Sequence, residues 1–448
     1  MGTAGPCWKL GERRLRKCRG YNLSMGNGGQ YAGAGYERVR LTDRIGIGVL
    51  TRLLPRDLVD EVIAEAGRRE QRRRLLPARV VVYYVLALCL FFGEGYEEVM
   101  RRLVGGLQFM RSWAADWQVP TTGAICQARQ RLGAEPLRLL FERVAVPVAR
   151  AGTPGAWLAG RRLMAIDGFV LEVPDTASNE AEFGRSGSGK YTPYPQVRVV
   201  GLGECGTHAI VGAAFGGFRT PERDLARQLF PGLEPGMLVL ADRGFYSYQL
   251  WKQALQTGAD LLWRVPATVN LRIVKALPDG SYRSLLPDPV VRQRRAVQRS
   301  KGGFVEEQTG IPVRVVEYQI EDRAGSDEIF CLITTIFDPE EVTAAELAAA
   351  YQQRWEFETS LDELEIHQRG PARILRSKSA EMVKQEIWAL LLTHYAIRDL
   401  ICQAAEQADI DPDRLSFIRS LRVIRRQVTD QAAFPPQTAE NRPRTSDR

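Results

Sequence analysis

Residues 163–265 alternate between two hydrophobic periods, and their order constrains the fold more than any other feature of the chain. Apolar residues recur at every second position in the predicted strands and at every third or fourth position in the predicted helices. In chain order we predict three strands, a helix, a strand, a helix and a strand, which indicates an α/β domain. The strands are expected at 163–173, 196–202, 208–215, 237–241 and 260–265, and the helices after Pro221 and at 247–257.

Two aspartates occupy related positions in this order. Asp167 falls inside the first predicted strand, and Asp242 directly follows the fourth. The element order is that of a ribonuclease-H-like domain, in which these two strands are neighbours, so we expect the two carboxylates to lie close together. For either aspartate alone, an ordinary strand end or turn would be a sufficient explanation.

A long helix is predicted at residues 343–370, and both of its ends are marked. Thr343 can cap the first turn, Glu346 stands where a capping box requires an acid, and Gly370 can end the helix. Good helix formers fill the interior. We therefore expect one continuous helix.

One face of this helix carries a tyrosine, an arginine and two glutamates. Tyr351, Arg354, Glu358 and Glu365 fall within roughly 60° of one another at about 100° per residue, beside an apolar stripe. An arginine and a carboxylate four residues apart, at the edge of a buried face, are suited to binding phosphate and metal ions. The alternative is the solvated charged face of an ordinary surface helix.

These residues resemble a known family. Tyr351, Arg354 and Glu358 have the spacing of the Tyr-Arg-Glu-Lys signature of insertion-sequence DDE transposases, the IS-four group. The segments Ala-Ile-Asp-Gly around Asp167 and Val-Leu-Ala-Asp-Arg-Gly-Phe-Tyr around Asp242 resemble the first two acidic motifs of that group. The three motifs occur in the order that the family requires.

The resemblance implies a DNA transposase that cuts element ends and joins them to target DNA by a cut-and-paste route. Asp167, Asp242 and Glu358 would be the catalytic residues and would bind two Mg²⁺ ions, or Mn²⁺, with Asp167 as the bridging ligand. Carboxylate oxygens are the ligands that such hard cations prefer. Tyr351 and Arg354 would contact DNA. Relatives act on double-stranded DNA as a homodimer and pass through a hairpin intermediate.

The resemblance covers roughly residues 41–400 and departs from the signature at Glu365, where a lysine is expected. A lysine would attract a DNA phosphate, whereas a glutamate repels one. We therefore expect weak activity or none, and a gain from Glu365→Lys. Two alternatives stay open: a catalytically impaired remnant that only binds DNA, and an unrelated ribonuclease-H-like nuclease.

The fold class predicted for the whole chain is α/β, with a ribonuclease-H-like core that a β-rich insert interrupts and an all-helical N-terminal domain precedes. The insert is expected to alternate short strands at 271–275, 313–320 and 329–335 with basic turns such as the one at Arg292. The predicted divisions are a disordered extension at 1–40, a helical DNA-binding domain at 41–152, the first part of the core at 155–262, the β-rich insert at 263–335, the last core helix at 336–370, and a helical region with a disordered tail at 371–448.

Five further residues are predicted to contact DNA. Arg129 and Arg131 lie on a helix expected at 122–132, and Arg185 and Lys190 lie in a basic loop. For the helix, an ordinary solvated basic face explains the pattern equally well. Trp263 is the nearest candidate for a tryptophan that stacks on a flipped base in relatives, although its apolar neighbours favour packing inside a strand.

The composition limits the partners and the compartment. Lysine and arginine exceed aspartate and glutamate, giving a net charge of +8, which favours a polyanionic partner. The seven cysteines are scattered and odd in number, so they predict neither disulfides nor a zinc site. The apolar run at 80–92 is too short to span a bilayer. We expect a bacterial cytoplasmic, nucleoid-associated protein without a membrane partner, whose histidines at 208, 367 and 394 are too scattered for a competing metal site.

Overall fold

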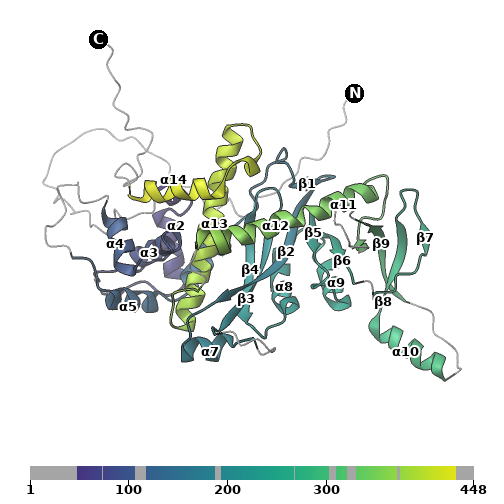
Figure 1. Ribbon diagram of the computed structural model, residues 1–448, viewed down its shortest axis with the longest axis horizontal. Helices are drawn as coiled ribbons and strands as arrows, with labels where there is room; N and C mark the ends of the chain where they lie inside the picture. Colours follow the sequence, from purple (N-terminus) through teal and green to yellow (C-terminus); the bar gives the residue numbers. More distant parts are fainter. Residues whose placement is uncertain are drawn as a thin grey trace, which may run out of the picture. The chain divides into compact units, whose positions relative to one another are not determined.

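The computed structural model describes residues 48–72, 74–105, 118–186, 193–266, 268–301, 309–319, 329–370 and 374–429 (Figure 1). Residues 41–448 form one compact unit. The extension expected at 1–40, the tail from residue 434 and Lys190 lie outside the described residues.

The centre of this unit is a mixed sheet whose first five long strands have the expected order. These strands are β2 (Arg161–Glu172), β3 (Gln196–Glu204), β4 (Ala209–Gly217), β5 (Met237–Ala241) and β6 (Asp260–Arg264). They lie in the order β4-β3-β2-β5-β6. The first three are antiparallel, whereas β5 pairs parallel with β2 and β6 parallel with β5. With α8 (Glu222–Leu229) and α9 (Tyr248–Leu255) as connections, this is the arrangement expected of a ribonuclease-H-like core.

Both faces of the sheet are covered, because successive side chains of β2 enter different cores. Met164 and Ile166 pack with residues of α8 and α9. Leu163 and Ala165 face the other way, into a core that includes Phe357. The strands therefore read as nearly continuous apolar runs, as is usual for strands buried on both faces.

Residues 275–334 extend the same sheet beyond β6. The strand β10 (Phe330–Thr334) pairs antiparallel with β6, followed by β9 (Gly310–Tyr318), β8 (Tyr282–Pro287) and the two-residue β7 (Lys275–Ala276). Two expectations for this segment are wrong. Residues 271–274 are not a strand, and the expected basic turn is the helix α10 (Pro289–Ser300), whose first turn is capped by Asp288. None of its residues is buried, and its many arginines leave no apolar stripe by which the helix could be recognised in the sequence.

Helices that precede the core in the sequence pack against a helix that follows it. The described N-terminal helices are η2 (Gly48–Arg52), α2 (Arg56–Glu65), α3 (Ala78–Leu90), α4 (Tyr96–Gly105), α5 (Thr122–Leu132) and α6 (Glu135–Val144). α6 begins with Pro136 at its first turn and ends at Val144. The long helix α13 (Ala380–Gln407) contacts α3, α6 and β4. One hydrophobic core therefore joins the helices to one face of the sheet.

The remaining described helices are α7 (Ala177–Phe183), η3 (Phe230–Gly232), η5 (Pro412–Arg414) and α14 (Phe417–Thr429). The run at 80–92 is a core helix, as expected: apart from Arg79, every residue of α3 is buried. Among the described residues, no helix combines the length and the apolarity that crossing a bilayer requires.

The segment expected as one regular helix at 343–370 is interrupted twice. It consists of α11 (Ala344–Gln352), α12 (Arg354–Asp362) and a π-helical segment, η4 (Glu363–Gln368). The expected capping box between Thr343 and Glu346 is present, and Gly370 has a left-handed φ of 68°. Because the π segment changes the number of residues per turn, Glu365 does not continue the stripe that a regular helix would give.

Candidate active site

Strand pairing brings the two aspartates together. Ile166 of β2 lies opposite Ala241 of β5, and Asp167 and Asp242 are the next residues of these two parallel strands. The carboxylate of Asp167 also accepts the backbone N–H of Gly168 at 2.8 Å. Their expected proximity is thus found in the structure, and it arises from the register of a ladder that is buried on both sides.

The helix α12 is fixed on the sheet by Phe357. This side chain is fully buried over β3, where Gly201 and Gly203 leave room for its ring. A Cβ atom built on Gly203 would lie 2.1 Å from ring carbons of Phe357. The two glycines therefore allow the helix to approach the sheet closely, which brings its neighbouring polar residues to Asp167.

Arg354 links two of the three acids. One guanidinium nitrogen lies 2.7 Å from Oδ2 of Asp167 and the other 2.8 Å from Oε1 of Glu358. Tyr351 approaches the third acid: its hydroxyl lies 3.4 Å from Oδ1 of Asp242. The three acids expected to be catalytic are thus gathered at one place with Tyr351 and Arg354, the two residues of the signature expected to contact DNA.

The electrostatics of the site reflect this crowding. Burial raises the pKa of Asp167, and the nearby carboxylates of Glu358 and Asp242 raise it further, while the Gly168 N–H and Arg354 act in the opposite direction. Although burial alone would lower the pKa of Arg354, Tyr351, Asp167 and Glu358 raise it. The guanidinium therefore stays charged and compensates for carboxylates that would otherwise repel one another.

The donor set fits a hard divalent cation. Asp167, Asp242 and Glu358 supply carboxylate oxygens, and their side chains are 19%, 34% and 40% exposed, so ions can reach them from solvent. The position between Asp167 and Glu358 already accommodates a positive group, the guanidinium of Arg354. A cation of higher charge density could replace it without leaving these carboxylates unpaired.

Two residues assigned to DNA contact are placed inside the protein. Arg129 is 0% exposed, and its guanidinium donates to Gln385, to Tyr96, to Ser377 and to the backbone of Met382. Trp263 is also 0% exposed, with its ring 5.3 Å from that of Trp251. Neither side chain can reach a base or a phosphate, so these two assignments are wrong. Packing, the alternative for Trp263, agrees with the structure.

The other two described candidates for DNA contact remain on the surface. Arg131 is exposed on α5. Arg185 is half-buried and forms ion pairs with Asp175 and Glu180, which occupy its guanidinium. The structure brings neither residue to the three acids.

A polar cluster that the sequence interpretation missed lies behind α12. His208 Nε2 is 2.7 Å from Glu356 and 3.3 Å from Asp413, and the ligand atoms of the three residues lie within 4.8 Å of one another. Burial alone would lower the pKa of His208, but hydrogen bonds to Glu356 and Glu363 raise it. The expectation that the histidines are too scattered for a competing metal site is therefore wrong for His208, because its ring nitrogen and the two carboxylates form a group that could hold an ion. Its partners are distant in sequence, so no spacing rule could find them.

The charged groups of this cluster pair with one another. Arg398 donates to Nδ1 of His208 at 2.5 Å and forms an ion pair with Glu363. His394 contacts Glu363 at 3.3 Å. The cluster thus joins η5 and α13 to α12 and η4 by ion pairs, and it supports the helix that carries Arg354 and Glu358.

Comparison with known proteins agrees with this site. Two family models match the chain: "Insertion element 4 transposase N-terminal" over residues 44–142 and "Transposase DDE domain" over residues 158–395. The second match includes Asp167, Asp242 and Glu358. It defines the class of protein, an enzyme that cleaves DNA and transfers its strands with the help of divalent metal ions.

Individual relatives are similar over about half of the chain or more. The transposase InsG for insertion sequence element IS4 of Escherichia coli (strain K12) is 30% identical over 391 residues, which are 86% of this chain and 84% of the relative. The putative transposase InsZ of the same strain is 28% identical over 221 residues, covering 49% of this chain and 71% of the relative. A solved piggyBac transposase synaptic complex with hairpin DNA has a TM-score of 0.47 at 12% identity, covering 85% of this chain and 79% of that chain.

From these matches, the chain belongs to the IS4 family of insertion-sequence DDE transposases.

Proposed function

We propose that Asp167, Asp242 and Glu358 are the catalytic acids of this transposase and together hold two Mg²⁺ ions, for which Mn²⁺ can substitute. The observation that carries the proposal is their convergence: Asp167 and Asp242 are neighbours in register, and Arg354 joins Asp167 to Glu358. Asp167 neighbours Asp242 in the ladder and shares Arg354 with Glu358, so it would be the ligand common to both ions. Asp242 and Glu358 each complete one ion site.

The reaction uses two kinds of step at phosphorus. Hydrolysis of a phosphodiester at the element end leaves a 3′-OH and a 5′-phosphate. In transesterification, a 3′-OH attacks a phosphodiester and displaces the 3′-OH of the attacked strand. Two bound divalent ions supply charge neutralisation on the phosphate and an activated oxygen nucleophile. The protein contributes positioning, because phosphoryl transfer depends on how the phosphate is held.

Arg354 is assigned to the DNA at this site, whereas Tyr351, for which the resemblance also implied DNA contact, is assigned to the support of a catalytic acid. Arg354 is held by two carboxylates when no cation is bound, and ions on those carboxylates would free its planar guanidinium to bind a phosphate. Tyr351 is buried on the floor of the site with its hydroxyl toward Asp242, so it supports the position of that carboxylate.

The finer organisation is proposed from the family resemblance. The helices before residue 152 would bind double-stranded DNA at the element ends, and residues 263–335 would form the β-rich insert of the core. Two copies would act together on two ends by a cut-and-paste route, in the bacterial cytoplasm at the nucleoid. A remnant that only binds DNA is not favoured, because all three acids are present and meet.

Single alanine variants test the assignment. Asp167→Ala, Asp242→Ala and Glu358→Ala should each abolish Mg²⁺-dependent cleavage of a duplex that carries the element end, while salt-sensitive binding of that duplex persists. Asp224→Ala, an exposed acid on α8, is the matched control and should cleave like the wild type. Wild-type cleavage by any of the three variants would remove that residue from the triad.

A further inference from the structure

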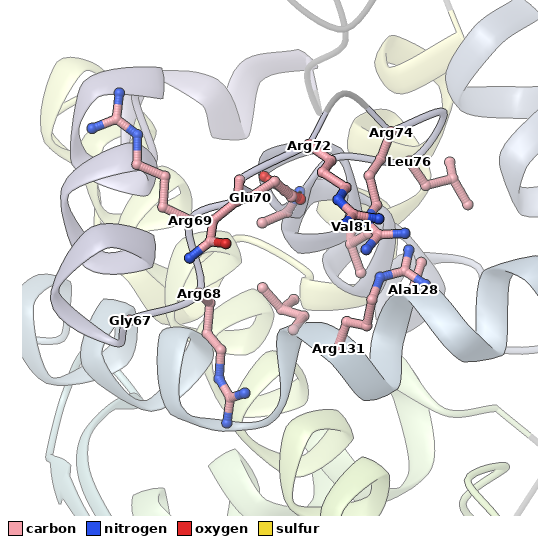
Figure 2. Close-up of a pocket in the computed structure, with 13 residues that line it drawn as sticks. Gly67, Arg68, Arg69, Glu70, Arg72, Arg74, Leu76, Val81, Ala128 and Arg131 are labelled. Atoms are coloured by element: carbon pink, nitrogen blue, oxygen red, sulfur yellow. The ribbon is translucent and has the colours of Figure 1, made fainter.

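A cavity of about 370 Å³ lies between the loop that joins α2 to α3 and the helix α5 (Figure 2). Its floor is apolar. Its rim carries five arginines, Arg68, Arg69, Arg72, Arg74 and Arg131, against one acid, Glu70. All five arginines are exposed to solvent. The cavity is thus strongly positive, and it is far in sequence from the catalytic acids.

Three of these arginines converge. Figure 2 shows the guanidinium groups of Arg72, Arg74 and Arg131 gathered on one side of the cavity, whereas Arg69 points away. Within the described part of the chain, these three form no ion pair or hydrogen bond. The carboxylate of Glu70 accepts the backbone N–H of Ala78 at the start of α3, so it is directed to the helix end. Three like charges at one place favour an anion between them.

The buried Arg129 explains why Arg131 faces the cavity. Residues two positions apart on a helix point in nearly opposite directions, because they are separated by about 200° around the helix axis. Arg129 is held inside by Gln385 and Ser377 of the C-terminal region, so Arg131 must face outward. The interior contacts of α5 therefore fix the direction of its outward arginine, which gives the cavity a preorganised wall.

The chemistry of the cavity matches a phosphodiester. A guanidinium presents a planar fork of donors that pairs with two phosphate oxygens, and several forks around one point can hold adjacent phosphates. Leu76, Val81 and Leu132 supply the apolar part of the lining, beside which the arginines stand. Because the cavity is open, a polymer backbone can pass across it.

We propose that Arg72, Arg74 and Arg131 form a phosphate-binding site that holds the backbone of duplex DNA, away from the catalytic acids. This inference rests on the proposed function, since it names a second place where the same DNA is held. The ligand chemistry, an anionic phosphate group, is shared by free nucleotides and inorganic phosphate. The ligand proposed for this site is the DNA backbone.

The test uses the full chain and the triple variant Arg72→Ala/Arg74→Ala/Arg131→Ala. We expect binding of a fluorescent duplex to weaken roughly tenfold or more at low salt, since sequence-independent affinity comes from phosphate contacts. The plot of log affinity against log salt concentration should also become shallower by about 2.7, or ~0.9 for each of three lost contacts. Unchanged affinity and slope would overturn the proposal.

A charge-matched triple variant separates a local site from general loss of positive charge. Arg101→Ala/Arg138→Ala/Arg143→Ala removes three exposed arginines of the same helical region, all of which have acidic partners. It should keep the affinity and most of the salt slope. Equal weakening by both triple variants would mean that net charge alone matters, and the site would be rejected. Thermal unfolding of each variant confirms that it is folded.

Two further measurements identify the ligand and separate this proposal from the catalytic one. At constant ionic strength, inorganic phosphate or dAMP that displaces duplex from the wild type at millimolar concentration would point to a free phosphate ligand and overturn the commitment to DNA. If neither compound displaces the duplex, the result supports the DNA backbone as the ligand. Cleavage by the wild type, by Glu365→Lys and by Asp167→Ala is measured in parallel: if neither the wild type nor Glu365→Lys cleaves, the catalytic proposal is defeated, whatever the triple variant binds.

Discussion

The guanidinium of Arg354 lies 2.7 Å from the carboxylate of Asp167 and reaches Glu358, one helical turn away, with its other nitrogen. The arginine therefore serves as the counter-ion of Asp167 and Glu358, two of the proposed catalytic acids, when no metal ion is bound. Metal binding and this ion pair use the same carboxylate oxygens, so they must compete.

Arg354→Ala should reveal this competition. Without metal, the variant should lose about 2 kcal/mol of stability, because a largely buried ion pair is broken and the acids repel one another. Mg²⁺ should then raise its melting temperature more than that of the wild type. Arg101→Ala, which removes an exposed arginine, should change neither quantity. The same Mg²⁺-induced shift in Arg354→Ala and the wild type would show that the ions do not replace the arginine.

Gly203→Ala tests how α12 is held on the sheet. The new methyl group would overlap the ring of Phe357, so we expect a loss of about 1–3 kcal/mol and a displaced helix. A shift of about 1 Å in Glu358 should lower the cleavage rate by roughly 10²-fold. Gly93→Ala, where nothing lies within 4 Å of the new atom, is the control.

The partner substitution gives a second readout for the same contact. Phe357→Ala alone leaves a cavity in the core, but together with Gly203→Ala it removes the clash. The double variant should therefore be more stable than the sum of the two single effects predicts, as measured by urea unfolding. Strict additivity would mean that Phe357 does not meet Gly203.

Glu365 makes the stability of the folded protein depend on pH. Burial raises the pKa of this carboxyl from 4.5 to about 7, with Asp362 acting in the same direction and Arg369 against it. Because the folded value lies above the unfolded one, the favourable contribution is complete below about pH 4.5 and is lost as the pH rises through 7. Glu365→Gln should thus match the wild type at pH 4.5 and melt at a higher temperature at pH 8. Glu340→Gln, at an exposed site, should show no such pH-dependent gain.

Glu365→Lys is expected to raise metal-dependent end cleavage above that of the natural protein. The position belongs to a π-helical segment, so a lysine there need not point along the stripe of Glu358. Its flexible four-carbon stem can still bring a positive charge to the DNA, whereas the natural glutamate adds a negative one. The comparison is cleavage at matched low salt, where such contacts matter most. Equal, robust cleavage by the two proteins would show that residue 365 does not hold the phosphate.

Much of the core was predictable because local signals agreed with tertiary packing. The strand β5 and the helix α5 occur at the predicted residues, since each is bounded by clear caps or turns and has a consistent period. The proximity of Asp167 and Asp242 followed from element order alone. The strand containing Trp263 was also read correctly, which already favoured its burial.

The errors arose where distant residues decide the outcome. The sequence of α5 does not show which arginine faces inward, because Gln385, 256 positions away, accepts from Arg129. Nor does it show that His208 meets Glu356, 148 positions along the chain. The π segment at Glu363–Gln368 is a further case, since its good helix formers predict a regular helix.

The pairing of β10 with β6 limits how the enzyme can handle DNA. Hydrogen bonds run without a break from the strand that precedes Asp242, through β6 and β10, to the strands that carry the basic helix α10. A segment joined in this way cannot swing over the acids as a hinged lid without breaking a ladder. A duplex that contacted both the acids and α10 would therefore have to adapt its own shape to a fixed arrangement of the two, and the deformability of the DNA next to the cleavage site would then affect transposition.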